Sequence, residues 1–160
     1  MKIEFNDIIL VIPRDIWKKL KEYEQGSTQN EAGGIILGKY IPDRNKYIIT
    51  DITVPSPKDK SGRLFFIRNK NVAQKSINEL WKENNGVINY LGEWHTHPWA
   101  NPKPSIPDLV FIKSLRKDKS NVWPELFMLI IGQNTTAAVI MSDKKNIIVK
   151  EVGYSESLYN

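Results

Sequence analysis

The 160-residue sequence contains no cysteine. Disulfide bonds, thiolate zinc sites and cysteine nucleophiles are therefore excluded, and a disulfide-stabilised secreted protein is not expected. The sequence also lacks an uninterrupted apolar run of the ~18 residues that a transmembrane helix requires, so no membrane partner is predicted. Acidic Glu4 and Asp7 stand where a signal peptide would carry its apolar segment, which predicts a cytoplasmic location.

Acidic residues are outnumbered by basic ones: 23 Lys and Arg against 18 Asp and Glu give a formal net charge of +5. Such a charge can favour nucleic acid or an acidic protein as a partner. The lysines are scattered, however, and the densest groups, Lys58/Lys60 and Lys144/Lys145, are equally consistent with solvated loops. Because no nucleic-acid-reading motif accompanies the charge, nucleic-acid binding is not the predicted function. The sequence leaves the oligomeric state open.

The apolar spacing predicts a single α+β domain over residues 1–160, with a core over about residues 5–152 and a mobile tail over 153–160. Helices are predicted over residues 14–24 and 71–84 and directly after Asp108. Six to eight strands are predicted, from the stretches 7–12, 35–37, 47–54, 64–67, 87–96, 126–131, 136–141 and 146–152. Residues 55–62 carry no regular pattern and are predicted to be mobile. The elements indicate a mixed, curved sheet flanked by about three helices.

The strand predicted around residues 35–37 is flanked by glycines that a strand interior would not normally contain. Gly33, Gly34 and Gly38 indicate either a bulge or the close approach of another backbone. Glu31 stands at the mouth of this strand. Taken alone, a glutamate in that position is more typical of a solvated loop than of a functional site.

Histidine is nearly as scarce as cysteine, and both copies, His95 and His97, lie in one apolar, strand-like run that Pro98 ends. Side chains two residues apart on a strand point to the same face, so the two imidazoles project together. Asp108 follows ten residues after Pro98. Two imidazoles and one carboxylate are a suitable donor set for Zn²⁺, and three protein ligands are typical of a catalytic rather than a structural zinc site.

The segment Ser105-Ile-Pro-Asp108 also has a purely structural interpretation. A serine at the N-cap with an acidic residue three positions on is a capping-box pattern, and proline suits a first helical turn. The two interpretations are compatible, because a helix that starts at Ser105 holds Asp108 on a rigid first turn. Glu93 lies on the same face of the predicted strand as the histidines, which suggests that it supports them.

These residues resemble the JAMM (MPN-type) zinc metalloprotease family. His-Thr-His-Pro, five intervening residues and Pro-Ser-x-x-Asp match the family motif without a gap, and Glu31 of Glu-Ala-Gly-Gly-Ile-Ile-Leu-Gly matches the upstream glutamate. The order of elements also fits over roughly residues 5–150. The local sequence Gly-Glu-Trp-His-Thr-His-Pro is most similar to that of bacterial stand-alone JAMM isopeptidases. The resemblance implies the JAMM/MPN, cytidine-deaminase-like architecture.

The resemblance implies one zinc ion per chain, held by His95, His97 and Asp108. Glu31 would accept a proton from the activated water and pass it to the leaving amine, and Ser105 would donate a hydrogen bond to the oxyanion. The implied activity is hydrolysis of isopeptide or peptide bonds after the C-terminal tail of a ubiquitin-like or other conjugated protein, in a bacterial conjugation or antiphage defence system. Processing or desulfuration of a small sulfur carrier, and a non-catalytic scaffold of the same fold, are the alternatives.

Overall fold

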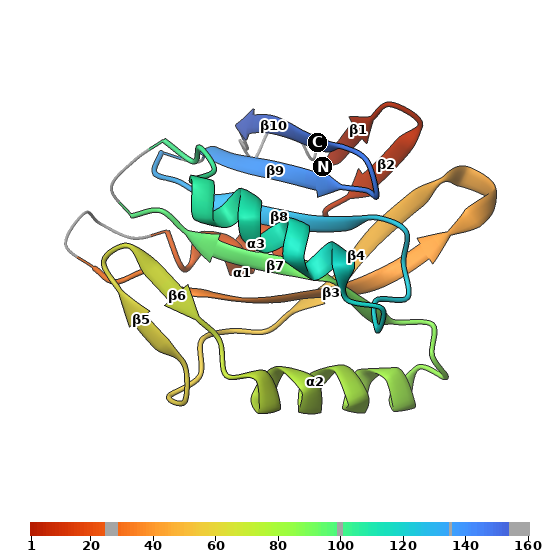
Figure 1. Ribbon diagram of the computed structural model, residues 1–160, viewed down its shortest axis with the longest axis horizontal. Helices are drawn as coiled ribbons and strands as arrows, with labels where there is room; N and C mark the ends of the chain where they lie inside the picture. Colours follow the sequence, from red (N-terminus) through yellow and green to blue (C-terminus); the bar gives the residue numbers. More distant parts are fainter. Residues whose placement is uncertain (25–28, 99–100, 135, 154–160) are drawn as a thin grey trace.

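The computed structural model describes residues 1–24, 29–98, 101–134 and 136–153. Within them, eight strands form one sheet in the order β1-β2-β4-β3-β7-β8-β9-β10, and two more form a separate hairpin (Figure 1). Neighbouring strands are antiparallel except for the pairs β2–β4 and β7–β8, which are parallel. The strands are β1 (Lys2–Phe5), β2 (Ile8–Val11), β3 (Gly33–Ile41), β4 (Lys46–Ile52), β5 (Lys60–Gly62), β6 (Phe65–Ile67), β7 (Asn89–Thr96), β8 (Leu126–Ile131), β9 (Thr136–Ser142) and β10 (Ile147–Gly153).

Three α-helices accompany the sheet in the described residues: α1 (Arg14–Lys21), α2 (Lys70–Glu83) and α3 (Ile106–Lys117). α1 ends three residues before the predicted boundary at residue 24. α2 begins at Asn69, whose side chain accepts hydrogen bonds from two backbone amides of the first turn and so satisfies donors that have no partner inside the helix. The predicted α+β class, with a mixed sheet and three helices, is confirmed.

Alternate residues of the central strands face two different helical layers. On β8, Phe127 and Leu129 belong to the large core that contains α1. Their neighbours Met128 and Ile130 instead pack with Ile112 of α3. Because side chains alternate along a strand, α1 and α3 must lie on opposite faces of the sheet. Figure 1 shows α3 crossing the front of the sheet, with α1 behind it.

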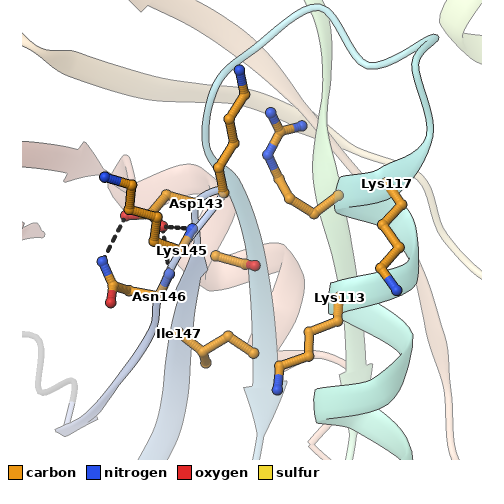
Figure 2. A pocket seen from close by; sticks show the side chains of 9 residues that line it. Lys113, Lys117, Asp143, Lys145, Asn146 and Ile147 are labelled. Carbon is orange, nitrogen blue, oxygen red and sulfur yellow. Dashed lines mark hydrogen bonds between the residues drawn. The ribbon is translucent and has the colours of Figure 1, made fainter.

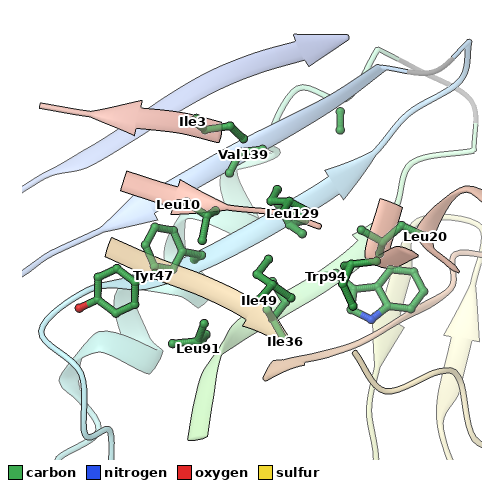
Figure 3. Close-up of a cluster of buried hydrophobic side chains, with 14 of the residues drawn as sticks. Ile3, Leu10, Leu20, Ile36, Tyr47, Ile49, Leu91, Trp94, Leu129 and Val139 are labelled. Carbon is green, nitrogen blue, oxygen red and sulfur yellow. The ribbon is translucent and has the colours of Figure 1, made fainter. Parts of the chain in front are cut away.

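The same alternation on β3 places the third helix. Ile36 joins the core on the α1 face, as Figure 3 shows, whereas Ile35 and Leu37 pack with Ala73 of α2. α2 and α3 therefore share one face of the sheet, and the functional residues on that face lie between these two helices and the central strands.

The sheet is strongly curved, so its two edge strands approach each other. The ammonium nitrogen of Lys150 on β10 lies 5.9 Å from the ring centre of Phe5 on β1. Ile3 of β1 and Val139 of β9 also share one core, although β1 and β9 stand far apart in the strand order (Figure 3). The predicted curvature is thereby confirmed.

The structure contains short strands that the sequence analysis did not predict. β1 has only four residues, although the burial of Ile3 and Phe5 does follow a two-residue period. Residues 60–62, expected to be mobile, form β5 and pair with β6 in a hairpin. The last strand, β10, extends to Gly153, and the rest of the predicted mobile tail lies outside the described residues.

The glycines of β3 allow close packing, as predicted. A Cβ atom on Gly34 would collide with the backbone oxygen of Thr53, and one on Gly38 with that of Ile48. The register of β3 against β4 also shifts between Leu37 and Gly38. Among the described helices, none is long and apolar enough to cross a membrane.

Candidate metal centre

β7 places His95 on the face shared by α2 and α3, and His97 follows directly after its last residue, Thr96. Trp94 and Leu91 face the opposite core, where each is almost completely buried. The strand is irregular at Gly92, which has a φ of 146° and leaves no room for a Cβ beside the backbone of Phe127. A residue with a side chain would be strained there, so the glycine is required by the backbone. His95 pairs with Gly33 on β3, which fixes its place along the sheet.

The start of α3 positions Asp108, through the capping box that the sequence predicted. The Ser105 hydroxyl accepts a hydrogen bond from the Asp108 amide, at 3.3 Å, and the Ser105 amide donates to Asp108 Oδ2, at 2.7 Å. The Ser105 hydroxyl also lies 2.6 Å from the same carboxylate oxygen. Because the box fixes the first turn and the carboxylate together, Asp108 is held rigidly toward β7.

The three side chains converge at distances that suit a single metal ion. His95 Nε2 lies 3.1 Å from His97 Nε2 and 3.3 Å from Asp108 Oδ1, and His97 Nε2 lies 3.5 Å from Asp108 Oδ2. Donor atoms bound to a tetrahedral zinc at about 2.0–2.1 Å are separated by about 3.3–3.4 Å. The donor set and its spacing therefore fit zinc. Within the described residues, these three form the one His, Cys, Asp and Glu cluster able to hold a metal ion.

The electrostatic environment keeps Asp108 ionised, as a metal ligand must be. Partial burial would raise its pKa, but hydrogen bonds from His95, His97 and Ser105 outweigh the burial and hold the pKa far below its usual range. The carboxylate is therefore available as an oxygen ligand over the whole physiological pH range.

Glu31 is buried beside this cluster, contrary to the solvated loop position that its surroundings in the sequence favoured. Only 8% of its surface is exposed. Its amide donates to the carbonyl oxygen of Gly62 on β5, and the adjacent Ala32 exchanges hydrogen bonds with Thr96 on β7. Burial raises the pKa of Glu31, the two histidines lower it, and Asp108 raises it again. The carboxylate is thus electrostatically coupled to all three donors.

Glu93 lies on the predicted face of β7, but its carboxylate is engaged elsewhere. Arg68 donates through Nε to both carboxylate oxygens, at 2.8 and 3.0 Å, and the Tyr90 hydroxyl donates to one of them at 2.7 Å. No hydrogen bond joins Glu93 to a histidine in the described part of the chain. The sequence missed Arg68 and Tyr90, because a lone arginine before a helix carries no sign of a partner 25 residues away.

Comparison with known proteins agrees with this geometry. Residues 13–143 match the family described as prokaryotic homologs of the JAB domain. A protein of Escherichia coli (strain TW11681) named "CD-NTase/cGAS isopeptidase" is 36% identical over 126 residues, which cover 78% of this chain and 76% of that protein. A protein of the same name from Pseudomonas aeruginosa (strain BWHPSA011 / Pa011) is 32% identical over 130 residues, covering 81% and 80%.

A solved structure supports the fold independently of close sequence similarity. The solution structure of a Desulfitobacterium hafniense protein superposes with a TM-score of 0.62 at 19% identity, covering 94% of this chain and 98% of that one. The family match, the similar isopeptidases and the fold confirm the predicted protein family and enzyme type. The chain therefore belongs to the prokaryotic JAB (JAMM/MPN) family of metallo-isopeptidases.

Proposed function

We propose that the chain holds one zinc ion through His95, His97 and Asp108 and hydrolyses the isopeptide bond of a conjugated protein. The observation that carries the proposal is the convergence of three donor atoms with zinc-like spacing next to a buried glutamate. The names of the relatives support a conjugate that contains a CD-NTase/cGAS-type protein as the proposed substrate. A bacterial conjugation or antiphage defence system is the proposed setting.

His95, His97 and Asp108 would hold a zinc ion, which would supply Lewis acidity to polarise the scissile carbonyl and to lower the pKa of water toward about 7. Glu31 receives the proton of the attacking water and delivers it to the leaving amine, because it is the buried carboxylate coupled to the donor cluster but engaged in no hydrogen bond to it. Asp108 would hold the metal together with His95 and His97, while its Oδ2 accepts the hydrogen bonds from Ser105 that orient the carboxylate.

Ser105 caps α3 in the structure, and we propose that it also donates a hydrogen bond to the oxyanion during the reaction. Its hydroxyl proton points to Asp108 Oδ2 in the structure, so donation to an oxyanion requires that this proton rotates away. The side chain is exposed, which leaves it accessible to a substrate. The capping interactions through the Ser105 amide remain in place during that rotation.

The β5–β6 hairpin is the proposed guide for the extended tail of the substrate. Its turn end is attached to the site through the Glu31–Gly62 hydrogen bond, and the ring of Phe66 packs against Gly33. Leu64 in the turn and Phe65 and Ile67 on β6 expose 81%, 49% and 58% of their surface. An extended peptide can add to such an exposed strand, which provides backbone hydrogen bonds and apolar contacts together.

The decisive experiment replaces Glu31 and measures metal and activity separately. Cells that express Glu31→Gln should accumulate uncleaved conjugates, which mass spectrometry identifies and which then serve as the purified substrate. Cleavage should fall about 10²–10⁴-fold, the usual contribution of a positioned acid–base group, while about one zinc per chain is retained. Glu79→Gln, an exposed glutamate on α2, is the matched control and should cleave normally.

Full cleavage by Glu31→Gln would contradict the proposed proton transfer. A zinc-free wild-type protein under micromolar zinc would contradict the metal assignment and revive the scaffold alternative. C-terminally extended carriers, tested beside lysine-linked conjugates, distinguish sulfur-carrier processing from deconjugation.

A further inference from the structure

A second polar site lies at the opposite end of α3 from Asp108. A cavity of about 330 Å³ separates the last turns of α3 from the turn between β9 and β10 (Figure 2). That volume falls within the range of small-molecule sites. At a rise of about 1.5 Å per residue, Lys113 and Lys117 lie about 7.5 and 13.5 Å along the helix from Asp108. None of the three metal-donor residues lines the cavity, which is therefore distinct from the metal centre.

The cavity gathers positive charge from two elements. α3 contributes Lys113, Arg116 and Lys117, and the turn contributes Lys144 and Lys145. In Figure 2 the ammonium end of Lys113 extends from α3 toward Ile147. None of the five cations forms a salt bridge with any residue that the structure describes. Like charges at such proximity repel one another, so their grouping disfavours the free protein.

The one carboxylate of the cavity, Asp143, interacts with Lys145 but leaves the other four cations uncompensated. Asp143 accepts hydrogen bonds from the amides of Lys145 and Asn146, each at 2.6 Å, and thereby shapes the turn (Figure 2). Its pKa is lowered because these amide hydrogen bonds outweigh the effect of burial. The cavity therefore carries five cations against one carboxylate that is already engaged.

One donor in the cavity has no partner in the described residues. Arg116 Nε is buried and makes no hydrogen bond. An unsatisfied buried donor costs about 1–3 kcal/mol, which an incoming acceptor can recover. Ser142, which is 1% exposed, also lines the cavity and offers a hydroxyl donor. Cations near a helix C-terminus interact favourably with the helix dipole, but this does not account for the lysines of the turn.

We propose that this cavity binds a phosphate group, carried by a nucleotide-like ligand or a nucleic-acid end. A phosphate offers several oxygens around one centre and can accept from the arginine fork, the serine hydroxyl and the lysines together. A protein carboxylate has two oxygens and one charge, and would leave donors unused. The recessed shape also favours a compact anion over an acidic protein surface.

The test titrates zinc-loaded protein with pyrophosphate and follows backbone amide shifts by NMR. Saturable shifts should appear over residues 113–117 and 142–147. Arg116→Gln combined with Lys145→Gln should weaken the affinity at least tenfold. Lys18→Gln combined with Lys21→Gln, which removes the same charge from the exposed face of α1, should change it less than twofold. If the first pair unfolds the protein, Lys144→Gln with Lys145→Gln replaces it.

A 5′-phosphorylated dinucleotide and a longer single-stranded DNA are titrated in parallel, to separate a terminal phosphate from a chain of phosphodiesters. Binding of either at the same amides supports the proposal. Four results would overturn it. The first three are no saturable shift with any phosphate, equal losses in both double variants, and tighter binding of a polyglutamate peptide than of pyrophosphate. The fourth is a set of shifts confined to residues around His95, which would place the anion at the metal centre.

Discussion

The two ends of α3 present opposite electrostatic arrangements. At its beginning, the Asp108 carboxylate is surrounded by donors: two imidazoles, an amide and a hydroxyl. At its end, Arg116 and Lys117 meet further cations across a cavity and have no carboxylate partner in the described residues. A satisfied cluster holds catalytic groups in place, whereas an unsatisfied one gains by binding a ligand. One short helix thus combines a preorganised site with an uncompensated one.

The largest expected effect comes from removing the carboxylate at the beginning of α3. Asp108→Ala should reduce the zinc content from about one per chain to near zero, because three-ligand sites rarely keep the metal with two. Conjugate cleavage should fall to background. Metal analysis and a cleavage assay measure both effects. Asp118→Ala, at the other end of the same helix, is the control and should retain zinc and activity. Retained zinc in Asp108→Ala would show that another group completes the site.

An intermediate effect is expected from Ser105→Ala. Loss of the capping side chain should lower the free energy of unfolding by about 1 kcal/mol. Because Asp108 loses its orienting partner, zinc affinity should also fall about 10- to 100-fold. Denaturant unfolding and competition with a zinc chelator measure the two changes. Ser114→Ala removes a hydroxyl that bonds only within the helix and should change zinc affinity little. Equal zinc affinities of the two variants would mean that Ser105 acts as a cap alone.

The smallest effect is expected at the other end of the helix. Lys144→Gln with Lys145→Gln should leave cleavage unchanged and alter the free energy of unfolding by less than about 0.5 kcal/mol. The change should be stabilising at low salt and vanish at high salt, because it relieves repulsion between exposed charges. Thermal unfolding at two salt concentrations measures it. A clear destabilisation would show that these lysines have structural partners and would remove the contrast between the two ends.

The convergence of His95, His97 and Asp108, the proposed metal donors, could be predicted from the sequence because they lie within 14 residues and follow strand and helix periodicities that are themselves local. The burial of Glu31 could not, since it depends on a hydrogen bond to Gly62 in a hairpin whose first strand carries no pattern. The hydrogen bonds from Arg68 and Tyr90 to Glu93 could not be predicted from the sequence either. The basic cavity was missed because Lys113 and Lys145 meet only when α3 packs beside the β9–β10 turn.

At Gly92, β7 gains one residue relative to β3, and the alternation of its side chains between the two faces of the sheet shifts by one position. Tyr90, Glu93, His95 and His97 all face the functional side, although 90 and 93 differ by an odd number of residues. Leu91 occupies the extra place, with no matching partner in the register between β3 and β7. Deleting a residue at this point would force the strand into one of two registers. One register would keep Tyr90 on its present face, the other would keep His95 and His97 on theirs, and neither would preserve both.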